Sequence, residues 1–265
     1  MDRTVSANEA TILGLLELER PDLVTTTDLA KMLSGAGIAT APRVFAARLR
    51  AKGWLLPTAR RGVWEFAPAA LAGPYSSGDP LLGFRAFLAE YSSASCALTF
   101  QAAAWAQGLA DRVPTHPEIA VASRLLMRRL PDGLDLSVFA PKLPVLQVRG
   151  VPTLAPASII VHMCTKPSAV RSWASSAEWL PAVAAETSWP DLHEELAGRA
   201  MTVSTRTGYL LQGLRPDIAG QIEQRSASHG TTWFGPRTSV LRRDGSWQVA
   251  DTLLPFNPRN LEAVA

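Results

Sequence analysis

The sequence predicts an α+β protein in which an N-terminal winged helix-turn-helix precedes a larger mixed α/β domain. The first observation is that the chain contains no Asp or Glu between Leu29 and Trp64, where every charged residue is Lys or Arg. The second is a pattern of helix, turn, helix, strand, turn and strand in the same region. This combination is typical of a protein that binds double-stranded DNA, because a duplex presents a dense row of phosphates.

Local signals predict the helices of this first domain. A helix is expected over about Ser6–Arg20, where Glu9 lies three residues after a serine and predicts a capping box. A second begins after Thr25–Thr27, whose hydroxyls can accept hydrogen bonds from the free amides of a first turn. A third runs over about Ala41–Lys52 with Pro42 in its first turn, where proline is tolerated.

The third helix is expected to carry the recognition surface. At about 100° per residue, Arg43, Ala47 and Arg50 share a face opposite Phe45 and Leu49. A small residue between two arginines lets such a helix approach the floor of the major groove. We therefore expect Arg43 and Arg50 to contact base edges.

A basic hairpin is expected to follow the third helix. Trp54–Pro57 and Val63–Phe66 read as short strands joined around Arg60, Arg61 and Gly62. This wing would hold phosphate or enter the minor groove. The complete set of expected DNA-binding residues is Thr40, Arg43, Ala47, Arg48, Arg50, Lys52, Arg60 and Arg61.

The composition changes after residue 67. Residues 68–80 are rich in Pro, Gly and Ser and are predicted to be a linker, which gives domains at residues 1–67 and 81–265. In the second domain, helices are expected at Leu81–Tyr91, at Ser95–Gly108, and from Pro156 to about Arg225. Single strands are expected at Glu118–Ser123 and Leu134–Phe139. Two pairs of strands are also expected: Val145–Arg149 paired with Thr153–Ala155, and Val240–Arg243 paired with Trp247–Ala250.

Composition and motifs point away from catalysis. The chain has 265 residues, 47% hydrophobic content and a formal net charge of +3. Neither a signal segment nor a stretch long enough to span a bilayer is recognisable, so a cytoplasmic protein is expected. The two cysteines have no metal-ligand spacing, and phosphate-loop and nucleophile motifs are missing, so neither metal, cofactor nor catalytic residue is predicted.

One enzymatic alternative stays open. Asp132, Asp135 and Lys142 could form part of the site of a DNA-tethered nuclease. The position two residues after Asp135 is Ser137, however, which leaves magnesium with one carboxylate on that strand.

Short motifs in a fixed order run through most of the chain: Leu49–Leu55, Arg61–Phe66, Ala97-Leu98 with Gly108-Leu109, Arg149–Pro156, Arg206–Leu211 and Trp247–Val249. On these motifs the chain resembles the AbiEi-type antitoxins, the transcriptional autorepressors of bacterial type IV toxin–antitoxin and abortive-infection modules. Two positions depart from the family's pattern. Gln107 stands where a histidine is frequent and Trp64 where a tyrosine is usual, which puts any role of that histidine in doubt.

The resemblance implies a partner and a division of labour. It implies a nucleotidyltransferase-like toxin, encoded alongside, which the C-terminal domain counteracts without necessarily forming a stable complex. Arg206 and Tyr209 match the family's arginine-glycine-tyrosine segment and are three residues apart, so they are the candidate antitoxin surface. The competing and stronger expectation for Tyr209 is a place in the core with its hydroxyl hydrogen-bonded. On DNA, two copies are expected to occupy an inverted-repeat operator, because one winged helix makes few phosphate contacts.

Overall fold

The computed structural model describes residues 4–71, 75–91, 95–124, 133–224 and 230–262. Over these residues the protein is mixed α+β, as predicted. Two compact units divide the described residues between residues 91 and 95, and the second unit includes residues 135–262. The first unit thus extends beyond the predicted linker at residues 68–80.

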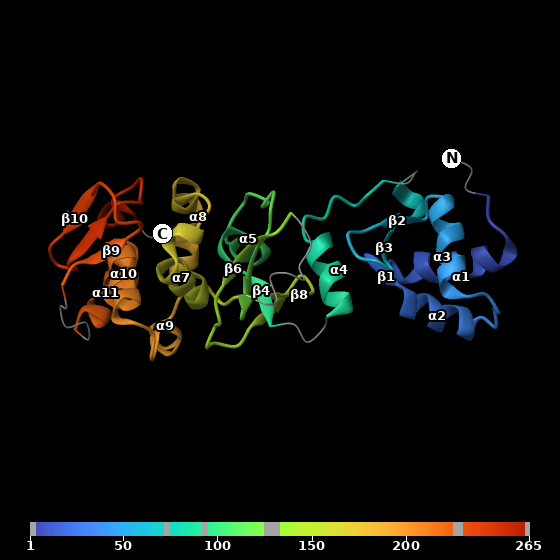
Figure 1. Ribbon diagram of the computed structural model, residues 1–265, viewed down its shortest axis with the longest axis horizontal. Helices are drawn as coiled ribbons and strands as arrows, with labels where there is room; N and C mark the ends of the chain where they lie inside the picture. Colours follow the sequence, from blue (N-terminus) through green and yellow to red (C-terminus); the bar gives the residue numbers. More distant parts are fainter. Residues whose placement is uncertain (1–3, 72–74, 92–94, 125–132, 225–229, 263–265) are drawn as a thin grey trace. The chain divides into compact units, whose positions relative to one another are not determined.

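The first unit packs helices against a small antiparallel sheet (Figure 1). Its sheet has the strand order β1-β3-β2. The elements are α1 (Ala7–Glu19), β1 (Leu23–Thr25), α2 (Thr26–Gly35), α3 (Pro42–Ala51), β2 (Leu55–Pro57) and β3 (Val63–Phe66). Ile12, Leu16, Leu29, Phe45 and Leu49 form the centre of its core and are fully or almost fully buried.

The predicted local signals set the helix boundaries. Ser6 with Glu9 caps α1, and Thr25 with Asp28 caps α2, each through a complete capping box. Pro42 lies in the first turn of α3. Strand β1 was not expected from the sequence; it pairs with β3 from Leu23 opposite Glu65.

The segment predicted to be a linker is partly held against the first unit. Glu65 is buried in β3 and accepts hydrogen bonds from the Ser76 hydroxyl and the Ser77 amide. A short 3₁₀ turn (Ala69–Leu71) lies within this segment, and α4 (Leu82–Glu90) follows the segment and packs against β1 and β3. Low periodicity indicated a linker, but a buried carboxylate requires donors, and this segment supplies them.

The second unit contains a mixed sheet that, over the described residues, has five strands in the order β6-β5-β4-β8-β7. Strand β4 pairs antiparallel with β5 and parallel with β8, and β5 pairs parallel with β6. The strands are β4 (Cys96–Leu98), β5 (Glu118–Val121), β6 (Asp135–Val138), β7 (Leu146–Val148) and β8 (Val151–Thr153).

The prediction of one helix over Ser95–Gly108 is wrong. This segment divides into β4 and α5 (Phe100–Ala106), and Phe100, the first residue of α5, takes a positive φ of 46°. Periodicity cannot distinguish a short buried apolar strand from a helix, and β4 is buried along its whole length in the middle of the sheet.

Helices dominate after Pro156, as predicted. They are α7 (Pro156–Thr165), α8 (Trp173–Ala185), α9 (Trp189–Leu196), α10 (Met201–Leu211) and α11 (Pro216–Glu223), with 3₁₀ turns at Pro167–Ala169 and Pro258–Asn260. None of the described helices is long and apolar enough to cross a membrane.

The predicted C-terminal hairpin is confirmed, although its strands are shifted along the chain. It consists of β10 (Arg242–Asp244) and β11 (Val249–Asp251), which pair antiparallel. A third strand, β9 (Thr232–Phe234), pairs parallel with β11 and was not expected.

Candidate nucleic-acid interface

An open hollow of about 930 Å³ in the first unit brings the predicted basic residues together. It is formed by the start of α2, one flank of α3, the β2–β3 hairpin and the end of α4. Arg43 and Arg50 of α3 face into it together with Arg60 and Arg61 of the hairpin. Four cationic side chains from two elements therefore share one concave surface.

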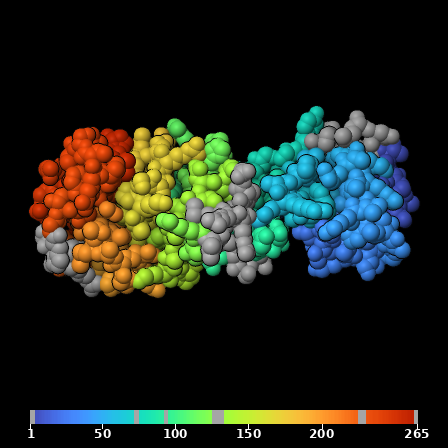
Figure 2. Space-filling view, in the orientation of Figure 1, coloured from blue at the N-terminus to red at the C-terminus, as the bar shows by residue number. Residues whose placement is uncertain are grey.

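The outer face of helix α3 carries small or apolar side chains between its arginines. Phe45, Ala46 and Leu49 are buried, whereas Val44 is 49% exposed and Ala47 is exposed on the opposite side. Figure 2 shows part of this region of the chain, around residue 50, in light blue on the surface of the first unit. The helix can therefore approach a flat surface closely at Val44 and Ala47.

Four of the expected DNA-binding residues are not among the described lining residues of the hollow: Ala47, on the outer face of α3, and Thr40, Arg48 and Lys52. Arg48 is exposed, but the lining of the hollow, as far as the structure describes it, does not include it. Thr40 is half-buried in the turn before α3, where its amide donates to the Ile38 carbonyl. Lys52 is paired with Glu9, at 2.6 Å between Nζ and Oε2.

The pairing of Lys52 stabilises the unit internally. The side chain of Glu9 is only 4% exposed. Burial raises the pKa of Glu9, but hydrogen bonds from Lys52 and Ser6 outweigh burial and hold this pKa below its ordinary value. Lys52 is therefore paired with a buried carboxylate on α1, and its expected contact with DNA stays a prediction.

The turn of the hairpin is docked on the start of α2. The Thr26 amide and hydroxyl both donate to the Gly62 carbonyl, at 2.9 Å and 3.2 Å. Gly62 has a φ of 82°, and a Cβ there would lie 2.9 Å from Thr26 Oγ1. Glycine is needed at this position for both reasons, and the turn that carries Arg60 and Arg61 is held in one place.

The two arginines of the turn have different surroundings. Arg61 is exposed. Arg60 lies 3.4 Å from Glu90 of α4, measured from Nε to Oε2, and its guanidinium carbon is 5.2 Å from the ring centroid of Phe87 and 5.0 Å from that of Tyr91. The sequence pattern predicted the same role for both arginines, but only Arg60 contacts the end of α4 among the described contacts.

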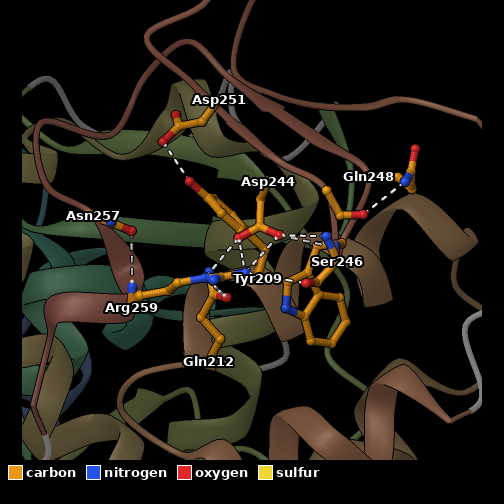
Figure 3. Close-up of polar contacts among 10 residues, drawn as sticks. Tyr209, Gln212, Asp244, Ser246, Gln248, Asp251, Asn257 and Arg259 are labelled. Carbon is orange, nitrogen blue, oxygen red and sulfur yellow. Dashed lines mark hydrogen bonds and ion pairs between the residues drawn. The ribbon is translucent and has the colours of Figure 1, made fainter.

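Tyr209, expected on an antitoxin surface, is in the core. Its side chain is fully buried, and its hydroxyl donates to Asp251 Oδ2 at 3.0 Å (Figure 3). Arg242 donates to the same oxygen at 2.7 Å. Burial raises the pKa of Tyr209, so the hydroxyl stays protonated and acts as a donor.

Arg206 is half-buried and has backbone partners. Its Nε donates to the Trp233 carbonyl at 2.7 Å, and its Nη1 donates to the Cys164 carbonyl at 3.2 Å. Burial lowers its pKa. The arginine thus joins α10 to α7 and β9, and the expected surface of Arg206 and Tyr209 is an internal polar support.

The acidic residues of the nuclease alternative do not form the expected metal site in the described part of the chain. Asp132 lies outside the described residues. Asp135 pairs with Arg171 at 2.9 Å, and Glu118, which the sequence analysis missed as its neighbour, stands opposite it on β5. Among the described residues no group of three His, Cys, Asp or Glu side chains is placed to hold a metal ion.

Glu118 is a buried carboxyl beside a hollow of about 430 Å³. Its Oε2 accepts from the Ala102 amide at 2.9 Å. Burial, helped by the charge of Asp135 and opposed by the hydrogen bond from the Ala102 amide, raises the pKa of Glu118 to about 7. The carboxyl is therefore close to half protonated at neutral pH.

His162 is fully buried and contacts Ser137, one of the residues that line this hollow. Its Nδ1 is 2.8 Å from the Thr99 hydroxyl, and its Nε2 is 3.1 Å from the Ser137 hydroxyl. Burial lowers the pKa of His162 to about 3. A neutral ring with both nitrogens hydrogen-bonded fits a structural role.

Known proteins resemble this chain at two levels, one over part of the second unit and one over nearly the whole chain. Residues 93–213 match the family model of the AbiEi antitoxin C-terminal domain. The crystal structure of the RV2827C protein from Mycobacterium tuberculosis is similar, with 26% sequence identity and a TM-score of 0.76 over 96% of this chain and 94% of that one. No curated protein matches the chain. Residues 93–213 are therefore similar to the AbiEi antitoxin C-terminal domain, which confirms the resemblance of the chain to the AbiEi-type antitoxins and supports a toxin–antitoxin role.

Proposed function

We propose that this protein is an antitoxin that also represses transcription by binding double-stranded DNA. The first unit, as a winged helix-turn-helix, would bind the duplex, and the second would counteract a nucleotidyltransferase-like toxin in the cytoplasm without catalysis. The observation that carries the DNA-binding proposal is the hollow that joins Arg43 and Arg50 of α3 to Arg60 and Arg61 of the hairpin. A convergent basic surface beside an exposed helix is what a duplex requires.

Each part of this surface has a distinct task in the proposal. Helix α3 enters the major groove, where Arg43 and Arg50 can contact guanine through two hydrogen bonds. Val44 and Ala47 can contact only apolar groups there, and thymine methyl groups supply them. Arg61, at the hairpin turn, contacts phosphate and sets position rather than sequence.

Gel-shift measurements test the DNA-binding proposal. Arg43→Ala should cost about 1–3 kcal/mol on the preferred duplex and relax its sequence preference. Arg61→Ala should weaken binding to all duplexes alike and reduce the salt slope by about one. Lys31→Ala is the matched control, because Lys31 is exposed on α2 and is not among the described lining residues. Unchanged binding in both arginine variants would reject the proposal.

Growth rescue tests the antitoxin proposal. The full-length double variant Arg43→Ala, Arg50→Ala should lose operator binding and still protect cells that express the cognate toxin from an independent promoter. Loss of protection despite normal protein levels would show that the two tasks are not divided between the units. The nuclease alternative gains no support from Asp135, whose carboxylate is paired with Arg171.

A further inference from the structure

A carboxylate borders the proposed DNA-binding hollow. Glu90, in the last turn of α4, lines it together with the arginines of α3 and the hairpin. The described lining residues include no other acid. A negative charge at this point opposes the approach of phosphates, so its presence calls for an explanation.

The partner of Glu90 is Arg60. The two side chains are 3.4 Å apart, with 44% of the Glu90 side chain and 19% of the Arg60 side chain exposed. The rings of Phe87 and Tyr91 also lie against the guanidinium, and their centroids are 5.0 Å apart. Arg60 is therefore positioned at the rim of the hollow while its charge faces a carboxylate.

We propose that Glu90 is a positioning residue that binds Arg60 in the place of a DNA phosphate and is displaced when a duplex binds. A carboxylate and a phosphate offer the same kind of acceptor to a guanidinium. A partly exposed ion pair at this distance is weak, so a polyanion can replace it. The rings of Phe87 and Tyr91 keep the guanidinium in place during the exchange. This inference rests on the proposed DNA-binding function.

Two consequences follow for the binding reaction. Glu90 lowers the affinity of the free protein for any duplex, because its contact with Arg60 must be broken first. It also makes the salt dependence of binding less steep by one phosphate contact, because the charge of Arg60 is already neutralised by Glu90 before the duplex binds. A merely structural role of Glu90 would change stability but leave the salt slope as it is.

The test measures binding of the full-length protein to a random-sequence duplex by fluorescence anisotropy over a series of salt concentrations. At low salt, Glu90→Gln should bind about two- to fivefold more tightly, with a salt slope steeper by about 0.9. Glu90→Asp should behave like the wild type. Glu19→Gln is the matched control, because Glu19 is exposed at the end of α1 and is not among the described lining residues.

A double-mutant cycle assigns the effect to Arg60. In an Arg60→Gln background, Glu90→Gln should bring no gain. The inference is overturned if Glu90→Gln binds as the wild type does or more weakly with normal thermal stability, or if its gain persists without Arg60. If neither the wild type nor Glu90→Gln binds the duplex at any salt concentration, the proposed function fails as well, which separates the two failures.

Discussion

The buried carboxyl of Glu118 gives a pH-dependent stability that can be worked out from the structure. Its pKa in the folded protein is about 7, against an ordinary value of 4.5, because burial penalises the charged form. The folded state therefore holds a proton that the unfolded chain releases. The stabilisation is fully present below pH 4.5 and is lost as the pH rises through about 7, and it amounts to about 3 kcal/mol.

Glu118→Gln should remove this dependence. In the wild type, the Glu118 carboxyl accepts a hydrogen bond from the Ala102 amide at 2.9 Å. The glutamine carbonyl can accept the same hydrogen bond, but glutamine carries no charge at any pH. The free energy of unfolding of the variant minus that of the wild type should therefore rise by about 3 kcal/mol between about pH 4.5 and about pH 8.

Because protonation of His162 also changes stability, the difference in unfolding free energy between Glu118→Gln and the wild type is more informative than either pH profile alone. Its folded pKa is lowered to about 3 from 6.5, so its contribution is present above pH 6.5 and is lost as the pH falls towards 3. Between pH 4.5 and 6.5 this slope opposes that of Glu118. Subtracting the wild-type curve from that of the variant cancels the His162 contribution.

Urea unfolding followed by tryptophan fluorescence supplies both curves, and Trp179 lines a second hollow beside Glu118. Glu223→Gln, which removes an exposed carboxyl at the end of α11, is the control and should leave the pH profile unchanged. A difference between Glu118→Gln and the wild type that is constant from about pH 4.5 to 8 would refute the reasoning, because Glu118 would then be ionised in the folded protein.

Other perturbations have expected outcomes in stability and binding. Tyr209→Phe should lower the free energy of unfolding in urea by about 1–2 kcal/mol, because Asp251 loses one buried donor but keeps others. If this variant still protects cells against the toxin at a permissive temperature, the hydroxyl does not contact the toxin. Gly208→Ala should cost at least about 2 kcal/mol, since its Cβ would lie 2.1 Å from the Trp247 ring. Gly220→Ala, in a helix with nothing within 4 Å, should instead stabilise by about 0.5–1 kcal/mol, and equal melting temperatures of the two alanine variants would contradict both. Two copies should protect an inverted repeat in footprinting, whereas one protein on an asymmetric half-site at saturation would argue against it.

Part of the candidate interface could be predicted because its signals are local. The capping boxes of α1 and α2 need residues three positions apart, and Pro42 and Gly53 lie next to the ends of α3. The shared face of Arg43 and Arg50 follows from helical spacing alone. These features depend on neighbours within two helical turns, so a linear pattern is sufficient.

Other features were decided by partners far away in the chain. Lys52 is paired with Glu9 and Arg60 with Glu90, and neither pairing leaves a trace in the pattern around the basic residue. Strand β4 was mistaken for helix because its neighbours β5 and β8, which make it a strand, come later in the sequence.

The sequence by itself determined the α+β class, the acid-free basic segment, the three N-terminal helices with the basic hairpin after them, and the resemblance to the AbiEi-type antitoxins. Only the tertiary structure decided that α4 belongs to the first unit, that Tyr209 is buried on Asp251, and that Glu118 stands beside Asp135. The reason is physical: helix caps and turns are stabilised by adjacent residues, whereas burial and ion pairing depend on which distant surfaces close over a side chain.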